Sequence, residues 1–386
     1  MIPYGRQDIS QADIDAIVEV LHSDFLTQGP RVPLFEEEVA AYCGVPYAVA
    51  CNSATSALHL ACLALGLGPG DNLWTSPITF VASSNCALYC GASVDFVDID
   101  PRTFNLCPQR LRQKLEHAAT CGLLPKVVVA VHMCGQPCDL RAIHGLAKEY
   151  GFAVIEDASH AIGARYLGEP VGNCRYSDIT VFSFHPVKIV TTAEGGLATT
   201  ADAQLAARMA LLRSHGVTRD QQQMQRTPHG PWYYEQIDLG FNYRMTEIQA
   251  ALGYSQVQRL DQYVQRRHEL AKRYDELLSN FPLERPWQHP DTYSAFHLYV
   301  VRLKVDGGHS HRAVHEAMRA AGILVNLHYI PVPMQPFYQN LGFDPTRWPE
   351  ACRYYAEAMT LPLYPTMTDK QQDQVVNCLK RALVAA

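Results

Sequence analysis

The sequence predicts an α/β fold, in which a large domain built on a mostly parallel β-sheet is followed by a smaller C-terminal α+β domain. Two observations carry this prediction. Short apolar segments rich in β-branched residues alternate with helical segments over the first 240 residues or so, as in a parallel sheet covered on both faces. Beyond that point a long charged helical segment and proline-rich connections appear. We therefore expect domains at residues 1–244, with the N-terminal segment, and 245–386.

Composition sets limits on what the protein does. Of the 386 residues, 48% are hydrophobic and 18% are charged, which is typical of a globular protein with a sizeable core. The formal net charge of -6 gives no basic surface for nucleic acid. The first residues lack the pattern of a signal peptide, and no stretch of 18 apolar residues occurs. We expect a cytoplasmic protein that acts on small molecules, without a nucleic acid or membrane partner.

The elements of the large domain follow from capping and periodicity. Ser10 and Asp13 form a capping pair at the start of a helix, and a second helix from about Phe35 ends at Gly44. A short buried strand then leads through a polar turn into a helix, and this unit recurs. The expected strands are 45–51, 73–77, 93–99, 126–133, 152–158, 178–184 and 195–200, and the expected helices are 53–65, 80–90 and 139–151.

In the smaller domain, periodic charged residues predict one long helix over 245–278. A proline-rich connection follows it, and a second one comes after residue 330. The remaining elements are expected as a strand at 297–304, a helix at 311–321, a strand at 322–330 and a terminal helix from about Asp369.

The 12 cysteines are mostly scattered singly through apolar segments, so we expect reduced core residues rather than disulfides. One group differs, because His132, Cys134 and Cys138 carry atoms that bind metals. No second Cys/His pair at ligand spacing completes a four-coordinate site, and we expect no metal there.

The sharpest chemical feature is a lysine in the segment SFHPVK, residues 183–188, which TTAEGG follows. Lys188 comes just after a buried strand, and no carboxylate stands beside it in sequence before Glu194. Partial desolvation should lower its pKa and favour the neutral amine, which suits Schiff-base chemistry with a carbonyl such as that of pyridoxal phosphate (PLP). An ordinary loop lysine facing solvent is the alternative.

Two further features point to the same chemistry. Asp157 ends the strand in VIEDASH, at the edge of the sheet where a carboxylate could pair with a protonated pyridine nitrogen. The segment CNSATS passes from a strand into a helix and would expose backbone N–H groups to a phosphate. Phe80 lies at another such junction, where its ring could stack on a flat cofactor. Taken singly, each feature also has an ordinary structural explanation: Asp157 as a solvated strand-end residue, the CNSATS segment as a helix cap, and Phe80 as a core residue.

The order of these motifs resembles the nucleotide-sugar aminotransferases of the DegT/DnrJ type, which are PLP enzymes of fold type I. NSATSAL, SPITFVAS, EDASHAIGA, SFHPVK with TTAEGG, and GFNYRMTEIQAALG occur in that order. IPYGRQ, LTQGP, VNLHYIPV and LPLYPTMTDKQQ extend the resemblance almost from end to end, and make it greatest to the 4-aminotransferases of the pseudaminic acid pathway.

The resemblance implies roles for individual residues. Lys188 matches the lysine that bonds the cofactor, Asp157 matches the partner of the pyridine nitrogen, and Phe80 matches the stacking position. Asn242 matches an asparagine that reaches the phosphate in the neighbouring subunit, which implies a homodimer with shared sites. The other cofactor positions are Ala54, Thr55 and Ser183 at the phosphate and His160 near the cofactor O3′. The implied nucleotide-sugar positions are Tyr4, Leu26, Thr27, Gln28, Gly29, Asn326, Leu327, His328 and Tyr329.

The implied reaction moves an amino group from an amino acid, L-glutamate, to C4 of a UDP-4-keto-6-deoxy-N-acetyl-hexosamine, with the cofactor alternating between PLP and pyridoxamine phosphate (PMP). Pro333 stands where the family often has histidine, which leaves the identity of the sugar open. Alternatives are an aminotransferase for another 3-keto or 4-keto sugar nucleotide, a decarboxylase or C–S lyase, and a regulator without catalysis. A regulator would be expected to lack Lys188 or Asp157, and related sugar dehydratases carry histidine in place of the lysine.

Overall fold

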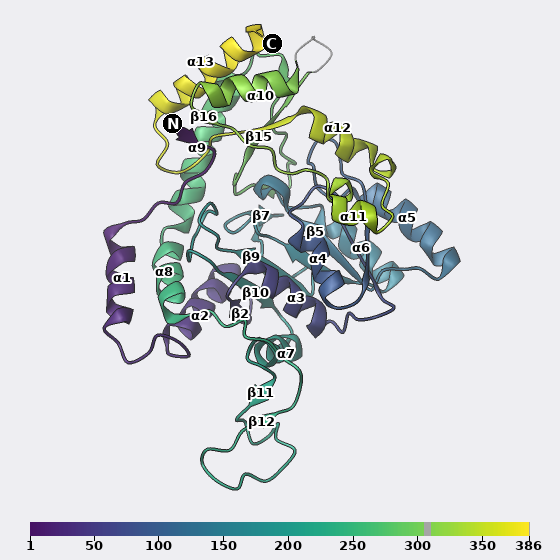
Figure 1. Cartoon of the computed structure of the whole chain (residues 1–386), viewed down its shortest axis with the longest axis vertical. Coiled ribbons are helices and arrows are strands. Elements are labelled where there is room, and N and C mark those ends of the chain that lie inside the picture. Colours follow the sequence, from purple (N-terminus) through teal and green to yellow (C-terminus); the bar gives the residue numbers. More distant parts are fainter. Residues whose placement is uncertain (305–309, 386) are drawn as a thin grey trace.

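The computed structural model describes residues 1–304 and 310–385 and is centred on a seven-stranded sheet (Figure 1). In spatial order, its strands are β2 (Tyr47–Cys51), β10 (Gly196–Thr200), β9 (Ile179–Ser183), β6 (Ala153–Asp157), β5 (Val127–Val131), β3 (Asn72–Thr75) and β4 (Ser93–Phe96). Only β10 runs against the others, because it pairs antiparallel with both β2 and β9. The prediction of a mostly parallel sheet is confirmed.

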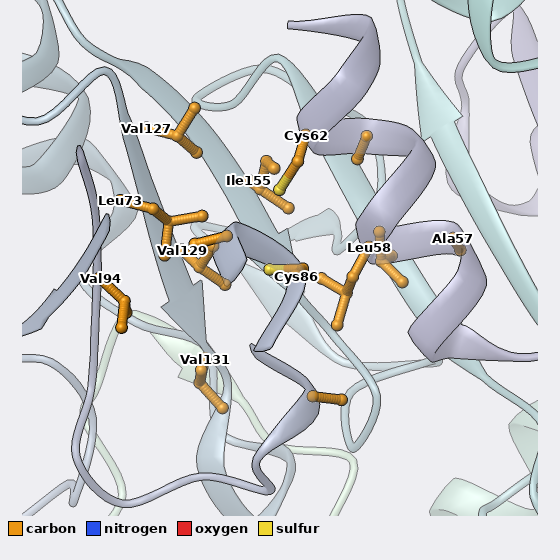
Figure 2. Close-up of a cluster of buried hydrophobic side chains, with 14 of the residues drawn as sticks. Ala57, Leu58, Cys62, Leu73, Cys86, Val94, Val127, Val129, Val131 and Ile155 are labelled. Atoms are coloured by element: carbon orange, nitrogen blue, oxygen red, sulfur yellow. The ribbon is translucent and has the colours of Figure 1, made fainter. Parts of the chain in front are cut away.

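Helices cover both faces of this sheet, which explains why its central strands are buried and mostly apolar. Alternate residues such as Val127 and Val129 pack with α3 (Ala54–Ala64) and α4 (Ala82–Tyr89), as Figure 2 shows. The residues between them, such as Val128, pack in a separate cluster with α5 (Pro108–Cys121) and α6 (Leu140–Tyr150). Nearer β2, the second face is covered by α2 (Arg31–Cys43) and α8 (Glu247–Val257), and α7 (Ala203–Arg213) packs on the first face.

The N-terminal helix α1 (Gln11–Leu21) lies against α8, which separates it from α2 (Figure 1). Ser10 caps it, with both hydrogen bonds of the capping box to Asp13 present. The fully buried Asp13 carboxylate also accepts hydrogen bonds from Ser255 (2.7 Å) and Gln256 (2.8 Å), and forms an ion pair with Arg259 (2.6 Å). One carboxylate therefore ties the first helix to the segment near residue 258.

The C-terminal part has its own core. A three-stranded antiparallel sheet contains β13 (Leu283–Glu284), β15 (Tyr299–Leu303) and β17 (Ala358–Leu361). It packs with α9 (Leu260–Leu277), α10 (His311–Ala320) and α13 (Asp369–Ala385). The N-terminus joins this part, because β1 (Ile2–Pro3) pairs with β16 (Ile323–Leu324) and the Tyr4 carbonyl accepts from the Leu363 N–H at 3.0 Å. The division at residues 244/245 stays a prediction.

Smaller elements complete the chain. The helices α11 (Pro336–Asn340) and α12 (Pro349–Glu357) lie beside the sheet edge at β4, and η1 (Met133–Gly135), η3 (Val332–Met334) and η4 (Pro345–Arg347) are single turns. β14 (Thr292–Tyr293), β7 (Arg165–Tyr166) and β8 (Glu169–Pro170) form a small sheet. Figure 1 shows the hairpin of β11 (Val217–Thr218) and β12 (Glu235–Gln236) projecting from the body as an arm.

The structure corrects several predicted elements. The helix expected over 245–278 is two helices, α8 and α9, separated at Gln258 and Arg259, where Arg259 turns to Asp13. The strand expected over 322–330 is only β16, because residues 326–329 leave the strand to line a cavity. The sequence patterns did not indicate the helices α5, α7, α11 and α12 or the strand β17. Within the described ranges, no helix combines the length and apolar character needed to cross a membrane.

Candidate active site

A cavity of about 570 Å³ opens at the carboxyl ends of the parallel strands. Val131, Asp157 and Ser183 are the last residues of β5, β6 and β9, and all three line it. Residues that follow β2 and β3 form further walls. This is the edge where ligands bind in open α/β sheets. Lys188 comes five residues after the end of β9 and lines the same cavity, so the lysine and Asp157 do meet.

Most residues that the sequence analysis predicted for the site line this cavity. They are Tyr4, Ala54, Thr55, Phe80, Asp157, His160, Ser183, Lys188, Asn326, Leu327, His328 and Tyr329. The remaining predicted residues, Leu26, Thr27, Gln28, Gly29 and Asn242, lie elsewhere. The Leu26 carbonyl accepts from the first N–H of α8 at 3.1 Å, and the Asn242 side chain is exposed.

Asp157 is buried, and hydrogen bonds hold both of its carboxylate oxygens. Ser83 donates to Oδ2 at 2.6 Å, while the Ser159 hydroxyl and N–H donate to Oδ1 at 2.6 and 3.1 Å. Hydrogen bonds to an ionised carboxylate are stronger than those between neutral groups, and they fix its orientation. The arrangement fixes the position of this carboxyl group at the base of the cavity.

Lys188 is half-buried in the cavity wall. Desolvation lowers the pKa of its amine to about 8, although the nearby Asp157 charge acts in the opposite direction. An amine with this pKa is substantially neutral near physiological pH and can attack a carbonyl carbon.

The wall opposite the sheet is formed by the N-terminal segment and residues 326–329. The Tyr4 and His328 rings lie 4.9 Å apart between centroids, and the Phe80 and Tyr329 rings 6.2 Å apart. Tyr329 Oη and His160 Nε2 are hydrogen-bonded at 3.1 Å. Burial lowers the pKa of His328 to about 3, with a smaller contribution from Lys188, so its imidazole is neutral.

The N-terminus of α3 presents a cradle for an anion. Ser53 caps the helix by accepting the Ser56 N–H at 3.1 Å, so the Ala54 and Thr55 N–H groups, which have no intrahelical acceptor, remain for a ligand. Gly196 makes this approach possible, because a Cβ at this position would lie 2.3 Å from the Ala54 nitrogen. Gly196 lies in β10 and also pairs with Ser183 of β9. The two segments expected to bind the phosphate, one at Ala54 and Thr55 and the other at Ser183, therefore both lie beside β10.

Several lining residues were missed in the sequence analysis. Thr79, three residues before α4, lines the cavity, and its hydroxyl is hydrogen-bonded at 2.7 Å to that of Ser83, which lies on α4 outside the lining. This i, i+4 spacing of hydroxyl residues was a usable signal. The other missed polar residues are Ser159, His185 and Glu194.

The group at His132, Cys134 and Cys138 is occupied by internal contacts. His132 Nδ1 accepts from the Cys138 N–H at 3.1 Å, and Nε2 lies 2.7 Å from Glu156 Oε2. Across residues 1–304 and 310–385, no three His, Cys, Asp or Glu side chains are arranged to hold a metal ion.

The donor set fits PLP. The cavity combines a nucleophilic amine at Lys188, a buried carboxylate at Asp157 for a ring nitrogen and backbone N–H groups at α3 for a phosphate. The buried Nδ1 of His160 has no hydrogen-bond partner in the described part of the chain, as expected of a polar wall that a ligand completes. Fold and site together define a PLP-dependent enzyme.

Comparisons with known proteins narrow this class. The chain belongs to the DegT/DnrJ/EryC1/StrS aminotransferase family, whose model matches residues 7–380. It is 39% identical over 383 residues to the spore coat polysaccharide biosynthesis protein SpsC of Bacillus subtilis, which covers 98% of this chain and 96% of that protein. The protein is thus a PLP-dependent sugar aminotransferase.

Two further relatives carry named sugar products. A UDP-4-amino-4,6-dideoxy-N-acetyl-β-L-altrosamine transaminase of Campylobacter jejuni is 35% identical over 98% of this chain and 96% of its own length. GDP-perosamine synthase of Caulobacter vibrioides is 35% identical over 96% of this chain and 95% of its own length.

Solved structures agree with this fold. Helicobacter pylori PseC, an aminotransferase of pseudaminic acid biosynthesis, matches with a TM-score of 0.90 at 30% identity, covering 100% of both chains. Spr1654 of Streptococcus pneumoniae, in its PMP form, gives the same TM-score, identity and coverage.

Proposed function

We propose that the enzyme transfers the amino group of L-glutamate to C4 of a UDP-4-keto-6-deoxy-N-acetyl-hexosamine, yielding a UDP-4-amino-4,6-dideoxy sugar of the pseudaminic acid type. The observation that carries this proposal is that Lys188 and Asp157 share a cavity with Tyr4 and residues 326–329, the segments that match the nucleotide-sugar wall. The Campylobacter relative and the Helicobacter structure named above support the same substrate class.

A second candidate is a different 4-keto sugar nucleotide. GDP-perosamine synthase is 35% identical to this chain, as is the UDP-sugar relative, so overall similarity does not favour either nucleotide. Pro333 is fully buried in the turn η3, where the family often has histidine. Unlike histidine, Pro333 cannot donate a hydrogen bond from its side chain to a sugar hydroxyl. The affinity test below therefore includes sugar nucleotides of the second candidate type.

In the proposed reaction, PLP supplies an aldehyde and a pyridinium ring that withdraws electrons from the bonds of the amino acid. Lys188 Nζ would hold the cofactor through its carbonyl carbon, and the freed amine would take the proton from the donor Cα and return it to the cofactor. Asp157 would hold a proton at the ring nitrogen. Ala54, Thr55 and Ser183 would bind the phosphate, Phe80 would stack on the ring, and His160 would lie near the cofactor O3′.

The proposal includes a homodimer with shared sites, in the cytoplasm. Asn242 and residues 26–29, which the resemblance assigns to the site, lie outside the cavity of their own chain. Asn242 is exposed beside α3, and Asn52 Nδ2 donates to its carbonyl at 3.4 Å. The outer face of α1 also exposes apolar side chains, namely Ile14, Val18 and Leu21. A second copy would cover such a face and supply these residues.

The proposal is tested by measuring the affinity of the holoenzyme for a set of UDP- and GDP-linked 4-amino and 3-amino sugars, together with L-glutamate turnover. The UDP-4-amino-4,6-dideoxy sugar should bind best. Lys188→Ala and Lys188→Arg should abolish turnover while the chain remains folded. Tighter binding of a GDP sugar would favour the second candidate, and retained turnover in either lysine variant would overturn the assignment of Lys188.

A further inference from the structure

Two buried imidazole rings lie against each other at the side of the cavity. The centroids of His160 and His297 are 4.4 Å apart, with the ring planes inclined at 42°. His160 lines the cavity, whereas His297 lies behind it, in the segment that leads into β15. Both residues are buried, and only His160 is among the residues that line the cavity.

Each of the two rings has one buried nitrogen atom without a hydrogen-bond partner within residues 1–304 and 310–385. The Nδ1 atoms of both His160 and His297 are buried without a partner among the described residues. Leaving a buried polar nitrogen unpaired is costly. A neutral imidazole carries one N–H and one lone pair, so a hydrogen bond between the two Nδ1 atoms would satisfy both at once.

Burial also keeps both rings neutral. Desolvation lowers the pKa of His160, with smaller contributions from Lys188 and His328. Desolvation likewise lowers the pKa of His297, with smaller contributions from His160, Lys188, Arg267 and His328. Neutral rings exist as two tautomers, and the tautomer of His160 decides whether its Nε2 accepts from or donates to Tyr329 Oη, which is 3.1 Å away.

The backbone around His297 is held in place from two sides. The fully buried Arg267 of α9 donates from Nη1 to the carbonyls of Phe296 and His297, each at 3.1 Å. On the other side, Ala295 and Leu298 donate to the carbonyls of Gly135 and Cys134 at 2.9 and 3.2 Å.

Two of these segments adopt backbone conformations that L side chains rarely take. Phe296 has φ of 45° and Cys134 has φ of 63°. Gly135, which follows Cys134, packs between the backbones of His160 and His297. It has no room for a side chain, because a Cβ would lie 2.8 Å from the His160 carbonyl oxygen and 3.0 Å from the His297 nitrogen. Strained backbone of this kind persists where the surroundings enforce it, and it is concentrated at functional sites.

From this geometry we propose that His297 is a positioning residue, which supplies the hydrogen-bond partner of His160 Nδ1 and thereby fixes the ring plane and tautomer of His160 toward Tyr329. His160 then presents a fixed face to the cofactor. The role is independent of which keto sugar is the acceptor, because it concerns only the resting site.

The test compares two substitutions of His297 that separate its ring from its nitrogen. His297→Phe keeps an aromatic ring against His160 but removes Nδ1. His297→Asn removes the ring but places an amide atom near the position of Nδ1. Histidine ¹⁵N spectra of the cofactor-free protein report the tautomer of His160, whose signals are identified by their loss in His160→Gln, and fluorescence titration gives the affinity for PLP.

We expect a single His160 tautomer in the unmodified protein. In His297→Phe, a second tautomer should appear and PLP should bind about tenfold more weakly, whereas His297→Asn should recover the single tautomer and most of the affinity. Unchanged spectra and affinity in the Phe variant would overturn the proposal, as would an Asn variant no better than Phe. If neither variant folds, interconverting tautomers in the unmodified protein would overturn it.

Discussion

The state of Lys188 before the cofactor binds can be tested through pH. With a pKa of about 8, roughly a quarter of the Lys188 side chains carry a neutral amine at pH 7.5. An exposed lysine, with a pKa near 10.4, would be neutral in only about one molecule in a thousand at the same pH. The neutral fraction, and with it the rate of bond formation with an aldehyde, is therefore raised by about two orders of magnitude.

We predict that the rate at which cofactor-free protein bonds PLP rises with pH and levels off with a midpoint near 8. Rapid mixing of apoprotein with PLP between pH 6 and 10, followed by absorbance, measures this rate. Lys188→Ala controls for bonding to surface lysines and should remove the fast phase. A fast phase whose rate still rises steeply above pH 9.5 would refute the conclusion that desolvation dominates at this amine.

Three other changes test the surroundings of the site and the N-terminal helix. Ser83→Ala removes a 2.6 Å hydrogen bond to Asp157, which costs about 1.5–3 kcal/mol, so PLP should bind at least about tenfold more weakly in a fluorescence titration; unchanged affinity would contradict the role of that bond. Gly196→Ala places a Cβ 2.3 Å from the Ala54 nitrogen and should lower the melting temperature and PLP affinity, whereas the control Gly145→Ala, where a Cβ meets nothing within 4 Å, should not. Asp13→Asn should lower the free energy of unfolding in urea at pH 7 by about 1.5–3 kcal/mol, because it removes the charge that the half-buried Arg259 side chain pairs with. Hydrogen bonds hold the pKa of Asp13 below its usual value, although desolvation acts in the opposite direction. The stabilisation by this carboxylate is therefore complete above about pH 4 and is lost as the pH falls through the lowered pKa. If the free energies of unfolding of the two proteins differed by the same amount at pH 7 and at pH 3, this reasoning would be wrong.

The buried strands were predictable because their signal is local. β5 is apolar throughout, β9 is buried along its whole length and rich in β-branched residues, and turn residues flank both, so their positions follow from the sequence alone. The helix α5 was missed because only Leu111, Leu115 and Ala118 of its 14 residues are buried, a narrow stripe in an otherwise polar segment. The break between α8 and α9 depends on Arg259 reaching Asp13, a contact across most of the chain that no local pattern contains.

The site residues also divide into those that sequence patterns predict and those that depend on contacts between distant segments. Lys188 and Asp157 follow strand ends, so the topology of a parallel sheet predicts that they meet. His297 carried no such signal, because its contact with His160 depends on how two distant segments thread past Gly135. The places of Leu26 to Gly29 outside the cavity could not be predicted, since the resemblance assigns these residues to a site without saying which chain completes it. For Asn242 the resemblance does imply the site of the neighbouring subunit.

The pairing of β1 with β16 has a practical consequence for work on the enzyme. Tyr4 follows β1 directly and contributes to the cavity wall. A change that loosens the pairing, such as a bulky tag remnant placed ahead of β1, would move the Tyr4 ring. Kinetic constants should therefore be compared between protein with and without such a remnant.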